Sequence, residues 1–186
     1  VHIADGMRYG NPSIKSALAE LRNKGATHLF IFPIFPQYTN TTSGTIIKAV
    51  FAELEKWRWL PSVQVLSDYH ENDAYIHSIV GSIRAYWAKN ERAEKLLFSF
   101  HGIPQEYVEK GDPYQAQCLR SAALIASELG LTEGQWLATF QSRFGPQTWL
   151  QPYTDVALEK LGSEKLASLA VICPGFAVDC LETVDE

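Results

Sequence analysis

Two hydrophobic patterns alternate along the chain. Apolar runs of strand length lie at residues 28–35, 62–66, 95–100, 136–140 and 166–173. Between these runs, apolar residues recur every three or four positions, the spacing of one helix face, over residues 13–24, 45–59, 73–89, 112–129 and 154–161. Strands that are apolar almost throughout are buried on both faces. The alternation therefore predicts an α/β protein whose parallel sheets are flanked by helices.

A polar stretch at residues 67–73 interrupts this alternation, and the strand and helix unit then begins again. The stretch reads SDYHEND, which is polar enough for a connection between two domains. We therefore predict two successive α/β lobes, residues 1–72 and residues 73–186. The chain starts at Val1 rather than at a methionine and stops at Glu186 inside an acidic segment, so we expect a part of a longer protein.

The composition argues against several functional classes. A chain of 186 residues can bury about 70% of its unfolded surface, which is enough for a core without disulfides. Three cysteines without a CxxC pair fit a reducing cytoplasm. No apolar run approaches the roughly 20 residues of a membrane span. A net charge of -5 without a basic stretch argues against nucleic-acid binding.

The sharpest candidate for chemistry is His101, which directly follows the apolar run at residues 95–100. Ligands of parallel α/β sheets bind beyond the carboxyl ends of the strands, and His101 stands at that edge. An imidazole there can accept a proton near neutral pH or ligate a metal ion. It can equally hydrogen-bond a loop, and position alone does not separate these interpretations.

Glu182 is the second candidate, because it follows the last apolar run and a turn at Pro174 and Gly175. Carboxylates at the start of a helix are also favoured by the helix dipole, which is a purely structural reason for their presence. If Glu182 lies near His101, the two side chains provide a base and an oxygen ligand at one sheet edge. Asp179 and Glu186 are weaker candidates for a supporting role.

Several ordered motifs resemble those of one family. They are MRYG at residues 7–10, FPQYTNTTSG at 35–44, FSFHGIP at 98–104, GDPYQAQC at 111–118, FQSRFG at 140–145, WLQPYTD at 149–155 and PGFAVDCLET at 174–183. Together they cover most of the chain and are similar to the ferrochelatases, of bacterial type, which insert ferrous iron into a porphyrin. The resemblance implies two Rossmann-like, chelatase-type lobes with a porphyrin cleft between them, the first lobe being incomplete.

The resemblance also implies roles for individual residues. It assigns the family's catalytic and metal-contacting pair to His101 and Glu182. It assigns substrate contacts to Met7, Arg8 and Tyr9, which match a motif on the opposite side of the cleft, and to Tyr38 in a substrate-facing loop. Ferrous iron is then a substrate, and no tightly bound cofactor is expected.

The sequence departs from some family members at two positions. Cys180 stands where some members have a histidine, and Asn40 stands where some have a cysteine that binds a [2Fe-2S] cluster. We therefore expect no such cluster in this protein.

The predicted reaction is insertion of Fe²⁺ into protoporphyrin IX, with His101 accepting pyrrole protons and Glu182 relaying them or guiding the ion. A related chelatase acting on coproporphyrin or sirohydrochlorin is a second hypothesis. Sirohydrochlorin carries many carboxylates, and only two cations, Arg8 and Arg143, lie near predicted strand ends. A non-catalytic porphyrin- or haem-binding protein is a third hypothesis, and an inactive truncated chain is a fourth. Metal selectivity, oligomeric state and transient membrane contact stay open.

Overall fold

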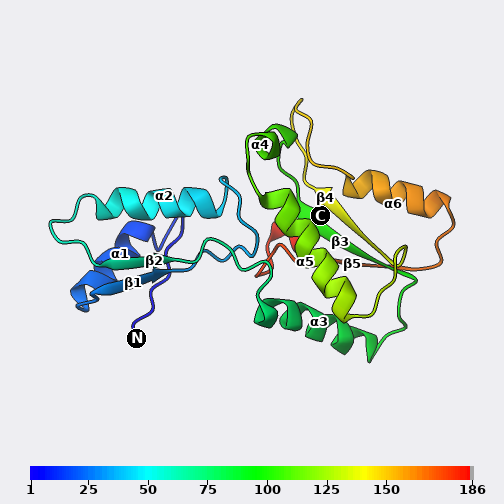
Figure 1. Cartoon of the computed structure of the whole chain (residues 1–186), viewed down its shortest axis with the longest axis horizontal. Helices are drawn as coiled ribbons and strands as arrows, with labels where there is room; N and C mark the ends of the chain where they lie inside the picture. The colour runs from blue at the N-terminus through cyan, green and yellow to red at the C-terminus, as the bar shows by residue number, and fades with distance from the viewer. Residues whose placement is uncertain (185–186) are drawn as a thin grey trace. The chain divides into compact units, whose positions relative to one another are not determined.

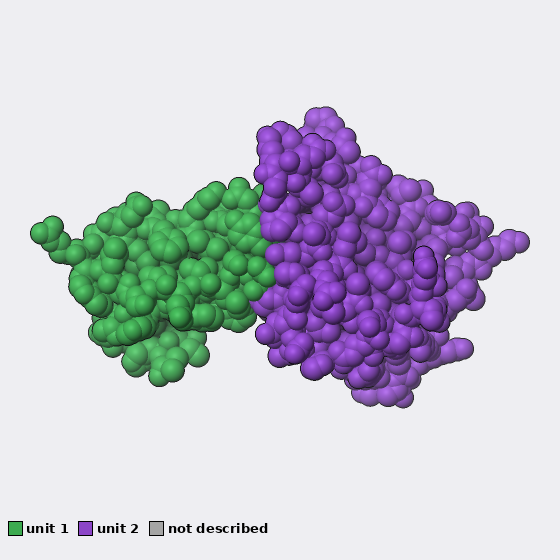
Figure 2. Space-filling view, in the orientation of Figure 1, with its two compact units in different colours: residues 1–34, 38–68 green, residues 35–37, 69–186 purple. Residues whose placement is uncertain are grey.

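The computed structural model describes residues 1–184, which divide into two compact units. The first unit comprises residues 1–34 and 38–68, and the second comprises residues 35–37 and 69–186, of which 185 and 186 are not described (Figure 2). Each unit has its own sheet and its own core.

The first unit contains two helices and two parallel strands (Figure 1). In chain order these are α1 (Ile14–Asn23), β1 (His28–Ile31), α2 (Ser43–Leu54) and β2 (Ser62–Val65). The Ser13 hydroxyl accepts a hydrogen bond from the Ser16 amide at 3.1 Å and so caps the start of α1. The core of this unit is built from the buried aliphatic residues Ile14, Leu18, Leu29, Val50 and Leu54.

The second unit contains a three-stranded parallel sheet in the order β4-β3-β5. Its elements are α3 (Asp73–Trp87), β3 (Lys95–His101), α4 (Gln105–Glu109), α5 (Tyr114–Glu128), β4 (Trp136–Gln141), α6 (Thr154–Ser163), β5 (Leu169–Ile172) and α7 (Leu181–Val184). The Asn72 side chain caps α3 by accepting from the amides of Ala74 and Tyr75. The predicted class, an α/β fold with parallel sheets flanked by helices, is confirmed.

Successive side chains of β3 and β4 point to opposite faces of this sheet. Phe98, Phe100 and Phe140 are fully buried in a core that they share with residues of α3 and α5. Side chains one position further along point to the opposite face, where Ser99 lies 3.0 Å from the Thr154 hydroxyl at the start of α6. Helices therefore cover both faces, and His101 ends β3 on the α6 face.

Candidate functional site

His101 is the last residue of β3 and is half-buried. The buried strand before it holds the backbone, and the Tyr114 hydroxyl donates a hydrogen bond to the His101 carbonyl at 2.9 Å. The ring lies beside the indole of Trp149, with 6.4 Å between ring centroids. The imidazole is thus presented at the carboxyl edge of the sheet by a rigid scaffold.

The hydrogen bond at the Nδ1 atom of His101 fixes the tautomer of the neutral ring. Nδ1 lies 2.7 Å from the Gly102 carbonyl oxygen. A carbonyl can only accept, so Nδ1 carries the proton and Nε2 keeps its lone pair. That lone pair is what a proton acceptor or a metal ligand requires. The geometry therefore leaves His101 able to serve in either role.

Glu182 lies in the short helix α7, whose start is tied by local hydrogen bonds. The Cys180 amide donates to the Thr183 hydroxyl at 2.9 Å, and that hydroxyl donates back to the Cys180 carbonyl at 3.0 Å. The pKa of the Glu182 carboxyl is lowered, first by a hydrogen bond from the Cys180 side chain, then by its own backbone amide and by the charge of His101. Glu182 is therefore favoured as a carboxylate, and it interacts electrostatically with His101.

Gln141 links these two candidates and was not identified from the sequence. It ends β4 and is the register partner of His101 across the parallel pair. Its side-chain amide donates to the Glu182 backbone carbonyl at 3.0 Å. A signal was available, because Ser99 with His101 and Thr139 with Gln141 are polar at alternate positions, whereas Phe100 and Phe140 between them are apolar.

Met7, Arg8 and Tyr9 lie together in a loop of the first unit. The Met7 amide donates to the Pro12 carbonyl at 2.7 Å, and the Met7 carbonyl accepts from the Ile14 amide at 3.3 Å. The Arg8 guanidinium stands 4.7 Å from the centre of the Tyr9 ring, a cation–π arrangement. Tyr9 is 79% exposed, so its ring is available to a ligand.

Tyr38 lies in the loop that leads into α2 and is half-buried. This loop leaves no space at Gly44, where a Cβ atom would stand 2.9 Å from the Tyr38 hydroxyl and 2.9 Å from the Asn40 side-chain oxygen. Asn40 also accepts a hydrogen bond from Lys48 at 2.7 Å. A side chain at position 44 would therefore displace the Tyr38 hydroxyl and the Asn40 amide from their present positions.

Arg143 is paired within the second unit. Its guanidinium forms two hydrogen bonds with the Asp155 carboxylate, at 2.9 and 2.7 Å, and lies 4.0 Å from the centre of the Tyr153 ring. This planar pair holds the segment after β4 against the start of α6. Arg143 thus has a structural partner of opposite charge.

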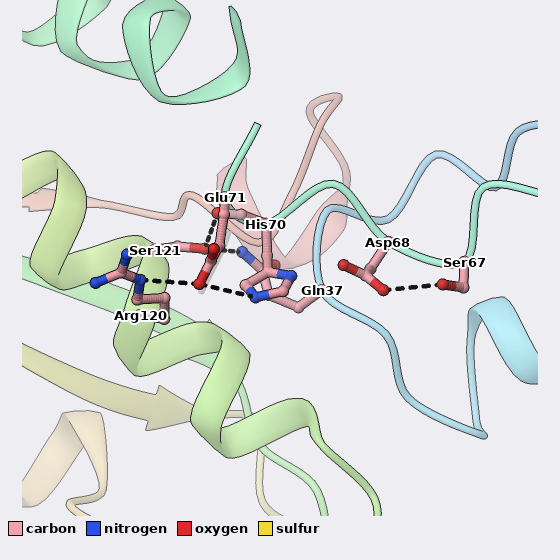
Figure 3. Close-up of polar contacts among 7 residues, drawn as sticks. All are labelled: Gln37, Ser67, Asp68, His70, Glu71, Arg120 and Ser121. Carbon is pink, nitrogen blue, oxygen red and sulfur yellow. Dashed lines mark hydrogen bonds and ion pairs between the residues drawn. The ribbon is translucent and has the colours of Figure 1, made fainter. Parts of the chain in front are cut away.

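A second polar cluster in this unit involves His70 (Figure 3). The His70 ring lies 3.7 Å from the Glu71 carboxylate, which accepts from Arg120 at 2.8 Å. The Ser121 hydroxyl donates to the His70 carbonyl at 2.8 Å and accepts from Gln37 at 3.0 Å. These bonds join residues 35–37 and the segment before α3 to helix α5, which indicates a structural role.

The described residues hold no group of three or more His, Cys, Asp or Glu side chains that could bind a metal ion. Cys118, Cys173 and Cys180 are free thiols. Glu186 was a weaker candidate in the sequence and lies outside the described residues. Within residues 1–184, no helix is both long enough and apolar enough to cross a bilayer.

The fold and the site define a parallel α/β protein with an imidazole and a carboxylate near the carboxyl edge of one sheet. The family model described as Ferrochelatase matches residues 1–186, and the chain belongs to the ferrochelatase family.

Curated relatives give the same assignment. The chain is 48% identical to the ferrochelatase of Thioalkalivibrio sulfidiphilus and 46% identical to that of Nitrosococcus oceani, in both cases over all 186 residues and 50% of the relative. It is 46% identical to the ferrochelatase of Pseudoalteromonas atlantica over 97% of this chain and 50% of the relative. The chain thus spans about half the length of these curated relatives.

Proposed function

We propose that this protein takes part in the insertion of Fe²⁺ into protoporphyrin IX to give protohaem. The observation that carries the proposal is the ferrochelatase family match over the whole chain. The chemistry is supplied by the His101 imidazole, whose Nδ1 atom is bonded to the Gly102 carbonyl, and by the Glu182 carboxyl, whose pKa is lowered.

The reaction requires removal of protons from the porphyrin. A free-base porphyrin carries two pyrrole N–H groups, and metallation releases both protons as Fe²⁺ takes their place on the four nitrogens. His101 accepts the first pyrrole proton at Nε2 while Nδ1 remains bonded to the Gly102 carbonyl, passes it through Glu182 to solvent, and then accepts the second. The imidazolium that forms is stabilised by the negative charge of Glu182.

Iron enters this scheme as a substrate. The ionised Glu182 and the His101 lone pair provide one oxygen and one nitrogen donor, which suit Fe²⁺ and also Zn²⁺. A site with two protein donors holds the ion weakly and so allows it to pass to the porphyrin. The three free thiols fit a reducing compartment, and we assign the reaction to the cytoplasm.

The first unit supplies the proposed porphyrin contacts. Tyr9 and Met7 are exposed and present an aromatic ring and a thioether to a planar apolar macrocycle. Arg8 supplies a positive charge for a porphyrin carboxylate, and Tyr38 adds a hydroxyl from the loop before α2.

The test is anaerobic metallation of protoporphyrin, with Fe²⁺ and with Zn²⁺ as a stable surrogate, followed by the porphyrin absorbance bands. It compares the 186-residue chain with a chimaera in which residues 1–186 replace the matching half of the T. sulfidiphilus ferrochelatase. Catalysed metallation in either protein supports the proposal. Porphyrin binding without metallation in both contradicts it and favours a carrier, and faster turnover of coproporphyrin would reassign the substrate.

A further inference from the structure

A buried polar network lies on the α6 face of the second sheet, next to His101. Ser99 and Thr139 are 1% and 0% exposed. The Thr154 hydroxyl lies 3.0 Å from Ser99 and 2.9 Å from Thr139, and the Ser99 hydroxyl donates to the side-chain oxygen of Gln141. Polar groups buried in this way are retained in a fold only when their hydrogen bonds are made.

The partners of Gln141 determine the orientation of its amide. The Glu182 carbonyl can only accept, so the group that faces it is the donor Nε2. The remaining atom, Oε1, accepts from the Ser99 hydroxyl and, at 3.7 Å, from the Cys173 thiol. Two donors and one acceptor thus hold the side chain in a single arrangement.

The helix that receives this hydrogen bond has little stability of its own. α7 comprises four described residues, Leu181–Val184, and a helix of that length does not persist without tertiary contacts. The bond from Gln141 to the Glu182 carbonyl connects α7 to the end of β4. His101 ends β3, the strand adjacent to β4. Gln141 therefore also fixes the position of Glu182 relative to the His101 imidazole.

We propose that Gln141 is a positioning residue for metallation, which holds the backbone of Glu182 at the edge of the sheet where His101 ends β3. The inference rests on the proposed function for the roles of those two residues. Gln141 touches neither iron nor porphyrin in this scheme, and it acts through Glu182. Supporting residues of this kind typically change activity by about 10- to 100-fold when they are replaced.

Gln141→Glu tests the donated bond specifically. A glutamate keeps the length of the side chain and can still accept from Ser99 and Cys173, but its carboxylate cannot donate to the Glu182 carbonyl. Ser121→Ala is the matched control, because it also removes a buried bond from a side chain to a backbone carbonyl, that of His70. Ser121 lies in α5, which packs on the face of the sheet opposite α6.

Two measurements on these variants test whether Gln141 positions Glu182. Zinc insertion is measured in the preparations described above, and we expect kcat to fall about 10- to 100-fold in Gln141→Glu, with the KM for porphyrin unchanged. Hydrogen exchange of the peptide covering residues 173–184 is measured in the 186-residue chain, and we expect faster exchange in Gln141→Glu only. Ser121→Ala should lower the melting temperature without either effect.

The outcomes separate this inference from the proposed function. Unchanged kcat and unchanged exchange in Gln141→Glu would overturn the positioning role, although metallation by the unmodified protein would still stand. If the unmodified protein does not metallate porphyrin, the proposed function fails. Faster hydrogen exchange in Gln141→Glu would in that case still show that Gln141 holds α7 against the end of β4. A higher KM for porphyrin with an unchanged kcat would also contradict the inference, because it would assign Gln141 to substrate binding.

Discussion

At the scale of single residues, Tyr75 shows how a hydroxyl group can join distant segments. Its hydroxyl donates to the Pro174 carbonyl at 2.8 Å and accepts from Gln37 at 3.2 Å. It thereby connects α3 to the segment that leads from β5 to α7. Burial raises the pKa of the Tyr75 phenol, and burial raises the pKa of Tyr69 to about 12.

Replacing Tyr75 with Phe should lower the free energy of unfolding by about 1–3 kcal/mol at neutral pH. The reason is that the Pro174 carbonyl and the Gln37 amide each lose a buried partner. Urea denaturation measures this change. Tyr86→Phe, on an exposed ring of the same helix, is the control and should change stability by less than about 0.5 kcal/mol.

The raised pKa values of Tyr69, Tyr75 and Tyr114 predict that the folded protein loses stability in alkali. Their pKa values in the folded state lie above the unfolded value of about 10, so the neutral phenol is favoured by folding. This contribution is complete below pH 10 and is lost as pH rises through the folded-state values. Unfolding free energies measured between about pH 8 and 11 should therefore fall, and Tyr75→Phe should reduce the slope. An unchanged slope in that variant would contradict the assignment.

The site residues that could be predicted from the sequence were those that directly follow a predicted strand. His101 and Glu182 could be identified because both follow apolar runs, and ligands bind at that edge of parallel sheets. Their roles remain predictions. The Nδ1 bond of His101 could not be derived, because it depends on the rotamer of the ring beside the Gly102 carbonyl. The link from Gln141 could not be derived either, because its partner Glu182 is far away in the sequence.

At the scale of elements, the turn that follows β3 is the most constrained connection near His101. The Gly102 amide donates to the Gln141 carbonyl at 2.8 Å. A Cβ atom at Gly102 would stand 3.0 Å from that carbonyl oxygen and 3.2 Å from the Trp149 ring. A side chain here would therefore push the ends of β3 and β4 apart.

Gly102→Ala should cost about 1–3 kcal/mol of unfolding free energy, because the backbone of β4 can yield only by a shift of the strand. It should also lower metallation, since His101 is the preceding residue. Gly81→Ala in α3 is the matched control: apart from the backbone of its own helix, no atom lies within 4 Å of its added Cβ, and it should stabilise the helix by about 1 kcal/mol. Thermal unfolding of both variants measures the difference, and stabilisation by Gly102→Ala would contradict the packing described.

Element types were predictable from periodicity, but several boundaries were not. The apolar run at residues 28–35 predicted a longer strand than β1, which ends at Ile31. Pro33 and Pro36 lack amide protons, and the strand β2 that pairs with β1 ends at Val65. Helix α4 was not predicted, because five residues are too few to show a helical period.

At the scale of the whole molecule, the two units differ in the size of their cores. The second unit buries Phe98, Phe100 and Phe140 in a three-stranded sheet. The first unit has a two-stranded sheet, and its described core residues are aliphatic. Fewer buried apolar contacts imply easier local opening, so stability should differ between the units.

Native-state hydrogen exchange should therefore show faster exchange in β1 than in β3, the central strand of its sheet. Leu18→Ala, which opens a cavity in the first core at a cost of about 2–5 kcal/mol, should accelerate exchange in β1 and leave β3 protected. Equal acceleration in both strands would show that the units unfold together rather than separately.

The central claim is that His101 accepts pyrrole protons during metallation, and the most direct measurement compares porphyrin binding with zinc insertion in His101→Ala. Loss of a positioned general base should slow insertion about 10²- to 10⁴-fold while the Kd for protoporphyrin stays within about threefold. His28→Ala, at the exposed start of β1, is the control and should insert zinc at the unmodified rate. Unmodified turnover in His101→Ala would contradict the account.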